Sequence, residues 1–334
     1  MQITSSNVIL LSAAAAIIPA LFYSALIYWF DRYEKEPIWL LSATFFWGAV
    51  PSIILALFAS LAFSVPLQSV AGPAVTNTAM TVLVAPPLEE TAKAMALVAI
   101  FVLLRHEVDS LLDGIIYGAM VGVGFAMVEN FFYFVTVYQA EGAGAWGATV
   151  FLRAIVFGLN HSLFTSATGL GMAIARFSAE RSVRILAPLG GWSIAVFLHA
   201  FHNLGASSGG LLCFILPFTD WGGVILLILI VAWALLQERN WIKDYLRDEI
   251  ERGTLTPEQY HIACSTRRRL AHRLQILTAH GFRAYLLATR FYRLCSELAY
   301  KKHHYVLLQE PRSEELTREL RDSLHTLSRT LTFI

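Results

Sequence analysis

The sequence predicts an all-α membrane protein, a polytopic helical bundle of about seven spans followed by a C-terminal cytoplasmic helical domain. Of its 334 residues, 56% are hydrophobic and only 15% are charged, which sets it apart from ordinary soluble domains. Apolar runs of membrane-spanning length recur, since a helix crosses a bilayer in roughly 20 residues. These runs cover residues 7–30, 38–63, 79–104, 111–138, 149–175, 185–204 and 209–236. We therefore expect a transmembrane bundle over 1–236 and a cytoplasmic helical domain over 237–334.

Lysine and arginine residues predict the orientation of these spans. They occur in the loops after the first, third and fifth spans, and seventeen more follow Gln237. The loops after the second, fourth and sixth spans contain none. By the positive-inside rule the N-terminus lies outside and the C-terminus lies in the cytoplasm. The first run is longer than the apolar part of a signal peptide, so we interpret it as a retained span.

Several spans carry features that predict local structure. The turn after the first span, Asp31 to Pro37, is charged and reads as a solvated loop with a topology signal. In the fourth span, small residues recur every four positions and predict a groove for close helix packing. They are Gly114, Gly118, Gly122 and Ala126. Pro217 and Asp220 interrupt the seventh run, so we expect its helix to begin near Trp221.

The third span contains the most unusual stretch, Pro86-Pro87-Leu88-Glu89-Glu90-Thr91-Ala92-Lys93. An ionisable group at bilayer depth costs roughly 2.5–3.5 kcal/mol on insertion scales, so two acids and an ammonium here need a reason. Helical spacing lets Lys93 pair with Glu89 or Glu90, which leaves one carboxylate over. A structural ion pair is one interpretation and a functional site is the other. If the helix begins at Pro87, both glutamates lie in its first turn, where the helix dipole favours anions.

Three other spans add polar residues at similar depth. They are Glu129 and Asn130 in the fourth span, His161 in the fifth, and His199, His202 and Asn203 in the sixth. At about 1.5 Å per residue, all of them fall between the midplane and the outer leaflet. We infer one water-accessible chamber that opens outward.

This set contains each group that peptide hydrolysis in a membrane needs, which would make the bundle over 1–236 a catalytic domain. A carboxylate can activate water and protonate the leaving amine, and imidazole and amide N–H groups can stabilise the oxyanion. The candidate catalytic residues are Glu89, Glu90, Glu129, His161, His199 and Asn203. The sequence contains no HExxH, but glutamates and histidines on separate helices could still hold a divalent metal such as zinc.

These motifs resemble the PrsW-type intramembrane proteases, within the wider Abi/CAAX-type group of glutamate-dependent membrane proteases. The resemblance covers roughly residues 20–205. It rests on Asp31 to Pro37, the EExxK of Glu89 to Lys93, Asp113-Gly114 with Tyr117-Gly118, Gly124 to Asn130, His161, and His199 with Asn203. His202 and the long tail have no counterpart in the family pattern.

The resemblance implies water activation by Glu89 and Glu90, with Glu129, His161 and His199 also in the site. It also implies site-1 cleavage of a membrane-anchored anti-sigma factor on its extracytoplasmic side, in the plasma (inner) membrane of a bacterium. We expect supporting roles for Lys93, Asn130, Asp113 and His202. A bound metal would take its ligands from Glu89, Glu90, Glu129, His161 and His199. We favour metal-free glutamate catalysis, because glutamate–asparagine pairs are not typical zinc shells.

Two other functions fit part of the pattern. The acids, Lys93 and the histidines could form the relay of a proton-coupled transporter, although no repeat of the span pattern supports this. A non-catalytic seven-span signalling scaffold would not need charges within its spans.

The remaining features concern the tail and the partners. Thr256-Pro257-Glu258-Gln259 predicts a capped helix to about His280, closed by Gly281 and followed by a helix to about Tyr300. A last helix is expected from Ser313 to about Thr330. The three cysteines show no paired spacing, so we expect no disulfide. We expect lipid, a membrane-anchored protein substrate and an unidentified partner for the tail, but no nucleic acid.

Overall fold

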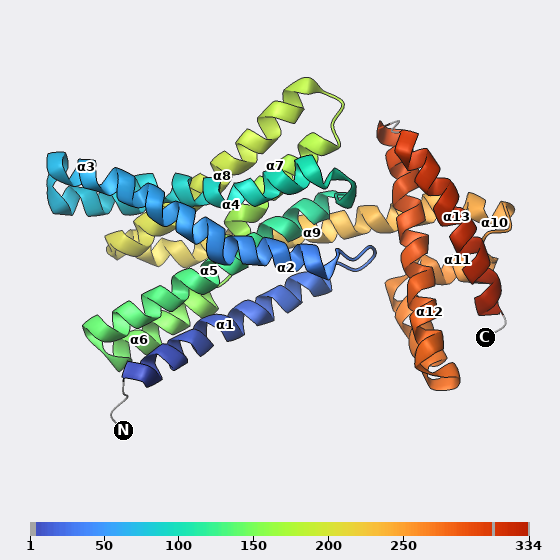
Figure 1. Ribbon diagram of the computed structural model, residues 1–334, viewed down its shortest axis with the longest axis horizontal. Helices are drawn as coiled ribbons and strands as arrows, with labels where there is room; N and C mark the ends of the chain where they lie inside the picture. The colour runs from blue at the N-terminus through green and yellow to red at the C-terminus, as the bar shows by residue number, and fades with distance from the viewer. Residues whose placement is uncertain (1–4, 309–310, 333–334) are drawn as a thin grey trace. The chain divides into compact units, whose positions relative to one another are not determined.

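The computed structural model describes residues 5–308 and 311–332, and every regular element in them is a helix. The chain forms two compact units (Figure 1). The first comprises Met1–Phe30 and Glu36–Ile230, and the second comprises Asp31–Lys35 and Val231–Ile334. The boundary at 230/231 lies inside one helix, α9, and the assignment of separate catalytic and cytoplasmic domains stays a prediction.

Nine α-helices and four shorter helical segments build the first unit, and the last of these helices, α9, continues into the second unit. The α-helices are α1 (Ser5–Phe30), α2 (Ile38–Trp47), α3 (Ile53–Ala79), α4 (Ala85–Leu103), α5 (Leu111–Glu141), α6 (Ala143–Val150), α7 (Asn160–Arg176), α8 (Arg181–Ser208) and α9 (Gly210–Leu246). Three segments are π-helical, η1 (Gly48–Ser52), η2 (Met80–Val84) and η4 (Phe151–Val156), and η3 (Arg105–Glu107) is a 3₁₀ turn.

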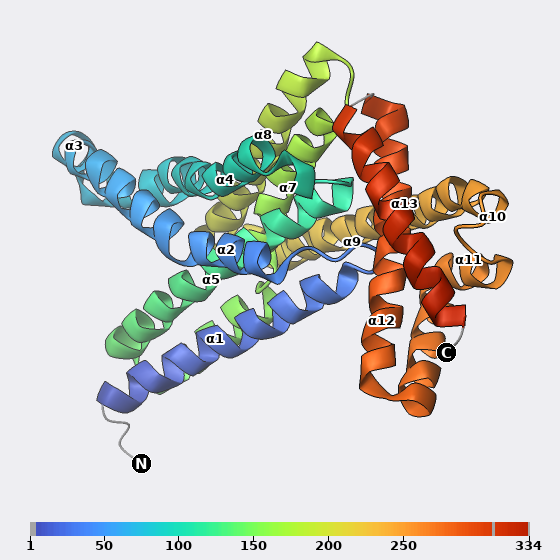
Figure 2. The same ribbon diagram turned by 45° about the vertical axis from the view of Figure 1, so that its right-hand side comes forward.

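Six stretches of the described chain are long and apolar enough to cross a membrane, which confirms the predicted polytopic bundle. The second stretch, Ile38–Leu103, has 66 residues and would be roughly 100 Å long if straight, about three times the thickness of a bilayer core. It reverses at Gly72, where φ is 76°, a value open to glycine. Figures 1 and 2 both show α3 running out and α4 returning beside it. These two arms account for the second and third predicted spans.

One predicted helix start was wrong, and a second start that was considered only as a condition does not hold. Helix α9 begins at Gly210 and accommodates Pro217 in its interior, rather than starting near Trp221. Helix α4 begins at Ala85, not Pro87, and follows η2 without a break. Glu89 and Glu90 therefore lie in the second turn of α4, and a dipole at a free helix end does not explain them.

Helix α5 is the buried centre of the first unit, and its glycines determine how closely α7 approaches. A Cβ at Gly118 would lie 2.6 Å from the carbonyl oxygen of Thr165, and a Cβ at Gly122 would overlap the carbonyl oxygen of His161. Gly114 meets Gly169 of α7 in the same way. The predicted small-residue groove is confirmed, and it presses α7 onto α5 at the level of His161.

The second unit is a helical domain built by the end of α9 with α10 (Asp248–Glu251), α11 (Pro257–Ala263), α12 (Thr266–Leu308) and α13 (Pro311–Thr332). The capping box of Thr256 and Gln259 forms as predicted. The predicted helix 257–280 is instead interrupted at 264–265, where Cys264 ends α11. Gly281 (φ 80°) divides α12 as expected, but the second half extends to Leu308 rather than Tyr300.

The core of this unit is apolar and includes one residue from the loop after α1. Tyr33 packs into it with Ile242, Leu246, Phe291 and Leu298. All three cysteines of the chain are free, in agreement with the sequence.

Candidate active site

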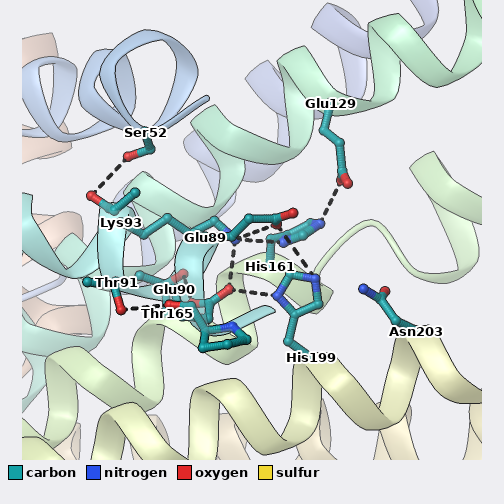
Figure 3. Close-up of polar contacts among 12 residues, drawn as sticks. Ser52, Glu89, Glu90, Thr91, Lys93, Glu129, His161, Thr165, His199 and Asn203 are labelled. Atoms are coloured by element: carbon teal, nitrogen blue, oxygen red, sulfur yellow. Dashed lines mark hydrogen bonds and ion pairs between the residues drawn. The ribbon is translucent and has the colours of Figure 1, made fainter. Parts of the chain in front are cut away.

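Four helices of the first unit bring charged and imidazole side chains together inside the bundle (Figure 3). Helix α4 contributes Glu89, Glu90 and Lys93, α5 contributes Glu129, α7 contributes His161, and α8 contributes His199. The two imidazole rings have centroids 5.0 Å apart. The sequence predicted that these residues would converge, and their geometry shows which contacts each one makes.

Glu90 is fully buried and every oxygen of its carboxylate is engaged. Oε1 lies 2.7 Å from Lys93 Nζ and 3.0 Å from His199 Nδ1, and Oε2 accepts a hydrogen bond of 3.1 Å from the Thr165 hydroxyl. Lys93 is equally buried, and its ammonium lies 3.8 Å from the centre of the Phe125 ring. A buried carboxylate needs such partners to remain charged. Glu90 therefore holds Lys93 and His199 in place.

The hydrogen bonds determine the tautomers of both histidines. An ammonium can only donate, so Lys93 Nζ, 3.0 Å from His161 Nδ1, leaves the ring proton of His161 on Nε2. His161 Nε2 then donates to Glu129 Oε2 at 2.9 Å. His199 donates from Nδ1 to Glu90, so its lone pair lies on Nε2.

Glu89 is the carboxylate left over. Its Oε2 is buried, and none of the described residues donates a hydrogen bond to it. The nearest charged or basic atoms are His199 Nε2 at 3.7 Å and Lys93 Nζ at 3.9 Å. The lone pair of His199 thus faces the unsatisfied oxygen of Glu89.

One residue of the cluster, Arg153 in η4, was not predicted as part of it. Its Nη2 donates to Glu129 Oε2 at 2.7 Å and its Nε donates to Asn130 Oδ1 at 2.9 Å. The guanidinium also stacks over the Tyr133 ring at 3.8 Å. Asn130 therefore supports Glu129 through Arg153. The only signal in the sequence was that Arg153 is a basic residue near the outer end of a span.

Asn203 lies near the cluster but its amide is turned elsewhere. Asn203 Nδ2 donates to the carbonyl oxygen of Thr81 at 3.0 Å. The π-helical η2 closes with a bond from Ala85 N–H to Met80 O. The next bond in that register would come from residue 86, but Pro86 has no N–H, and Asn203 provides the missing donor to Thr81.

Two predicted supporting residues lie in other polar groups. Asp113 forms a capping box with Ser110 at the start of α5. One turn further on, Tyr117 donates a hydrogen bond to Glu36. His202 pairs with Asp220 of α9, with 2.7 Å between Nδ1 and Oδ2.

The donor set suits a zinc ion in residue type. Glu89, His161 and His199 each have a candidate ligand atom, and these atoms lie within 4.8 Å of one another. A metal would have to displace the Lys93 ammonium from His161 Nδ1, because the other ring nitrogen of His161 donates to Glu129. Two imidazoles and one carboxylate form a common catalytic zinc set. The unsatisfied Glu89 Oε2 supports the fit, and its 3.7 Å distance from His199 Nε2 is close to the separation of about 3.3 Å between two ligands of one tetrahedral zinc. Glu90 and Glu129 would act as the outer carboxylates that orient the two imidazoles.

A helical bundle that spans the membrane several times and buries carboxylates and imidazoles together defines a class, the polytopic membrane enzymes with an internal site. Comparison with known proteins specifies the family. The model of the "PrsW family intramembrane metalloprotease" matches residues 36–236, and the chain belongs to this family of proteases.

The relatives agree with this assignment. The chain is 28% identical over 243 residues to "Protease PrsW" of Geobacillus kaustophilus, a match that covers 71% of this chain and 94% of that protein. It is 30% identical over 169 residues to "Protease PrsW" of Bacillus subtilis, covering 51% and 71%. A third relative, "Protease PrsW" of Oceanobacillus iheyensis, is 32% identical over 195 residues, covering 57% and 80%. No solved structure matches the chain.

Proposed function

We propose that this protease hydrolyses a peptide bond of a membrane-anchored protein at the gap between Glu89 and His199. The observation that carries the proposal is the pair of facing acceptors, Glu89 Oε2 and His199 Nε2, 3.7 Å apart in a buried setting. A water molecule can donate one hydrogen to each acceptor, which leaves its oxygen lone pairs directed outward. A carboxylate and an imidazole so placed act as general bases.

The reaction follows from these positions. The water oxygen attacks the scissile carbonyl carbon while Glu89 accepts the proton, and the proton is then delivered to the leaving nitrogen as the C–N bond breaks. Glu90 and Lys93 keep His199 and His161 in their tautomers. The buried setting strengthens these electrostatic effects. If Glu89, His161 and His199 held zinc instead, their lone pairs would serve as ligands rather than bases, and the metal would supply a Lewis acid for the scissile carbonyl.

The substrate class and orientation are further parts of the proposal. The asymmetry of lysine and arginine supports an outward N-terminus and a cytoplasmic tail in the inner membrane of a bacterium. On that topology the cluster lies toward the extracytoplasmic side. The family resemblance supports site-1 cleavage of a membrane-anchored anti-sigma factor.

Cleavage of candidate single-span proteins by the purified enzyme tests the proposal. We expect Glu89→Gln and His199→Gln to lower kcat at least about 100-fold, the usual scale for a general base. Glu141→Gln is the matched control, because Glu141 is an exposed acid at the end of α5. Wild-type rates in both site variants would refute the assignment of Glu89 and His199.

A further inference from the structure

A second buried polar cluster lies on α7, α8 and α9, beside the proposed site. Asp220 Oδ2 lies 2.7 Å from His202 Nδ1 and 2.8 Å from Asn160 Nδ2. Asn160 and Asp220 are only 4% and 5% exposed. A carboxylate in such a setting is costly unless hydrogen bonds compensate it, so this acid requires an explanation beyond helix packing.

The contacts assign a direction to each hydrogen bond. Asp220 Oδ2 accepts from the ring Nδ1–H of His202 and from the amide of Asn160. The two nitrogens are 2.9 Å apart because both point at the same oxygen. One oxygen on α9 therefore ties the beginning of α7 to the last turns of α8.

Each member on α7 and α8 is a close neighbour of a residue in the proposed site. Asn160 directly precedes His161, and His202 follows His199 by three residues. The Phe164 ring stacks on His199, with centroids 5.2 Å apart and an interplanar angle of 20°. Its centroid also lies 6.3 Å from that of His202. Movement of the second cluster would thus be transmitted to both imidazoles.

The start of α7 makes this anchor important. The π-helical η4 ends at Val156, and α7 begins at Asn160 after a short irregular stretch. Leu159 occupies the N-cap position and provides no side-chain hydrogen bond. A helix start without a cap frays readily. The side chain of Asn160, bonded to Asp220, anchors the first residue of the turn that carries His161, and Ser162 anchors the same turn to α5 through the Ala119 carbonyl.

We propose that Asp220 is a positioning residue of the protease: through Asn160 and His202 it fixes the orientations of His161 and His199. This inference rests on the proposed function. Asp220 does not touch the reacting atoms, so its loss should lower kcat and leave KM nearly unchanged. Removal of a residue that supports a reacting group from behind typically costs about 10–100-fold in activity.

Three variants test the proposal in the full-length protein. Asp220→Ala should lower kcat about 10–100-fold with KM within about twofold. Asp220→Asn keeps an oxygen acceptor at the same place and should recover most of the rate. Thr219→Ala is the matched control, because the Thr219 hydroxyl donates a hydrogen bond to the Leu216 carbonyl within its own helix, α9. A folded Asp220→Ala protein with wild-type kcat would overturn the proposal, as would an Asp220→Asn variant no better than Asp220→Ala.

Hydrogen exchange separates this inference from the proposed function. In Asp220→Ala, amides of residues 157–166 should exchange at least about tenfold faster than in wild type, while Thr219→Ala leaves them unchanged. Unchanged exchange in Asp220→Ala would overturn the anchor whether or not a substrate is known. If wild-type protein cleaved no membrane-anchored substrate but exchange rose as expected, the proposed function would fail and the anchor would stand.

Discussion

Replacing Gly122 by alanine should displace His161 and reduce both stability and activity. The new Cβ would lie 2.6 Å from the backbone nitrogen of Ser162, whereas ordinary contact begins near 3.4 Å. Helix α7 would have to retreat by more than this difference of about 0.8 Å in a close-packed interior, because the carbonyl atoms of His161 lie closer still. Overpacking of this kind typically costs about 1–3 kcal/mol. A displacement of about 1 Å in a reacting group can cost about 100-fold in rate.

The assay is thermal unfolding in detergent together with kcat/KM on a single-span substrate. Gly190→Ala in α8 is the matched control, since a Cβ there meets nothing within 4 Å. It should leave both quantities near wild type or raise stability slightly, because alanine favours helix over glycine by about 1 kcal/mol. Wild-type stability and activity in Gly122→Ala would refute the close approach of α5 and α7 and, with it, the placement of His161.

Three further predictions concern the metal and the second unit. Because Glu89 and His199 are proposed to activate water themselves, a chelator should leave cleavage unaffected, measured as the rate of product formation; loss of cleavage that zinc restores would instead assign Glu89, His161 and His199 as metal ligands. Burial, followed by repulsion from His304, lowers the pKa of His303 to about 4. The stability gained from neutral His303 should therefore be fully present above about pH 6.5 and be lost as the pH falls toward 4, by about 1 kcal/mol once its partial exposure is allowed for. Hydrogen exchange of α12 between pH 7 and 4 measures this loss, and the same slope in His303→Gln would contradict it. Tyr33→Ala should destabilise the second unit by about 3 kcal/mol, as truncation of a buried aromatic does, whereas Tyr33→Phe should not; equal exchange rates in both variants would contradict the burial of Tyr33.

The convergence of Glu89, Glu90, Glu129, His161 and His199 could be predicted because each is a costly polar residue in an apolar span. Such residues must face one another rather than lipid. Similar depth along several helices then implies a common location. The glycine repeat of the fourth span likewise predicts close packing, since only small side chains allow two backbones to approach so closely.

The hydrogen-bond partners of Asn203, Arg153 and Asp220 could not be predicted in this way. The hydrogen-bond partner of a side chain depends on the direction in which that side chain leaves its helix. Reasoning from sequence derives this direction from a regular period of 3.6 residues per turn. The π-helical segments η2 and η4 each alter that direction, and the sequence shows no clear signal for them. Asn203 therefore seemed to point at the acids, whereas it bonds to Thr81, the carbonyl that Pro86 leaves without a donor.

The charged residues of the site leave one negative charge that a proton or a metal cation could neutralise. Three carboxylates, Glu89, Glu90 and Glu129, meet two cations, Lys93 and Arg153, so with neutral imidazoles one negative charge remains. Glu90 and Glu129 each have a direct cation, at 2.7 Å in both pairs, so the excess falls on Glu89. Glu89 shares Lys93 with Glu90 at the longer distance of 3.9 Å, and a buried carboxylate compensated so incompletely is costly unless it binds a cation or takes up a proton. Either outcome would neutralise the charge of Glu89 and assist hydrolysis. Glu89 could take a proton from water, or it could bind a metal that polarises the scissile carbonyl.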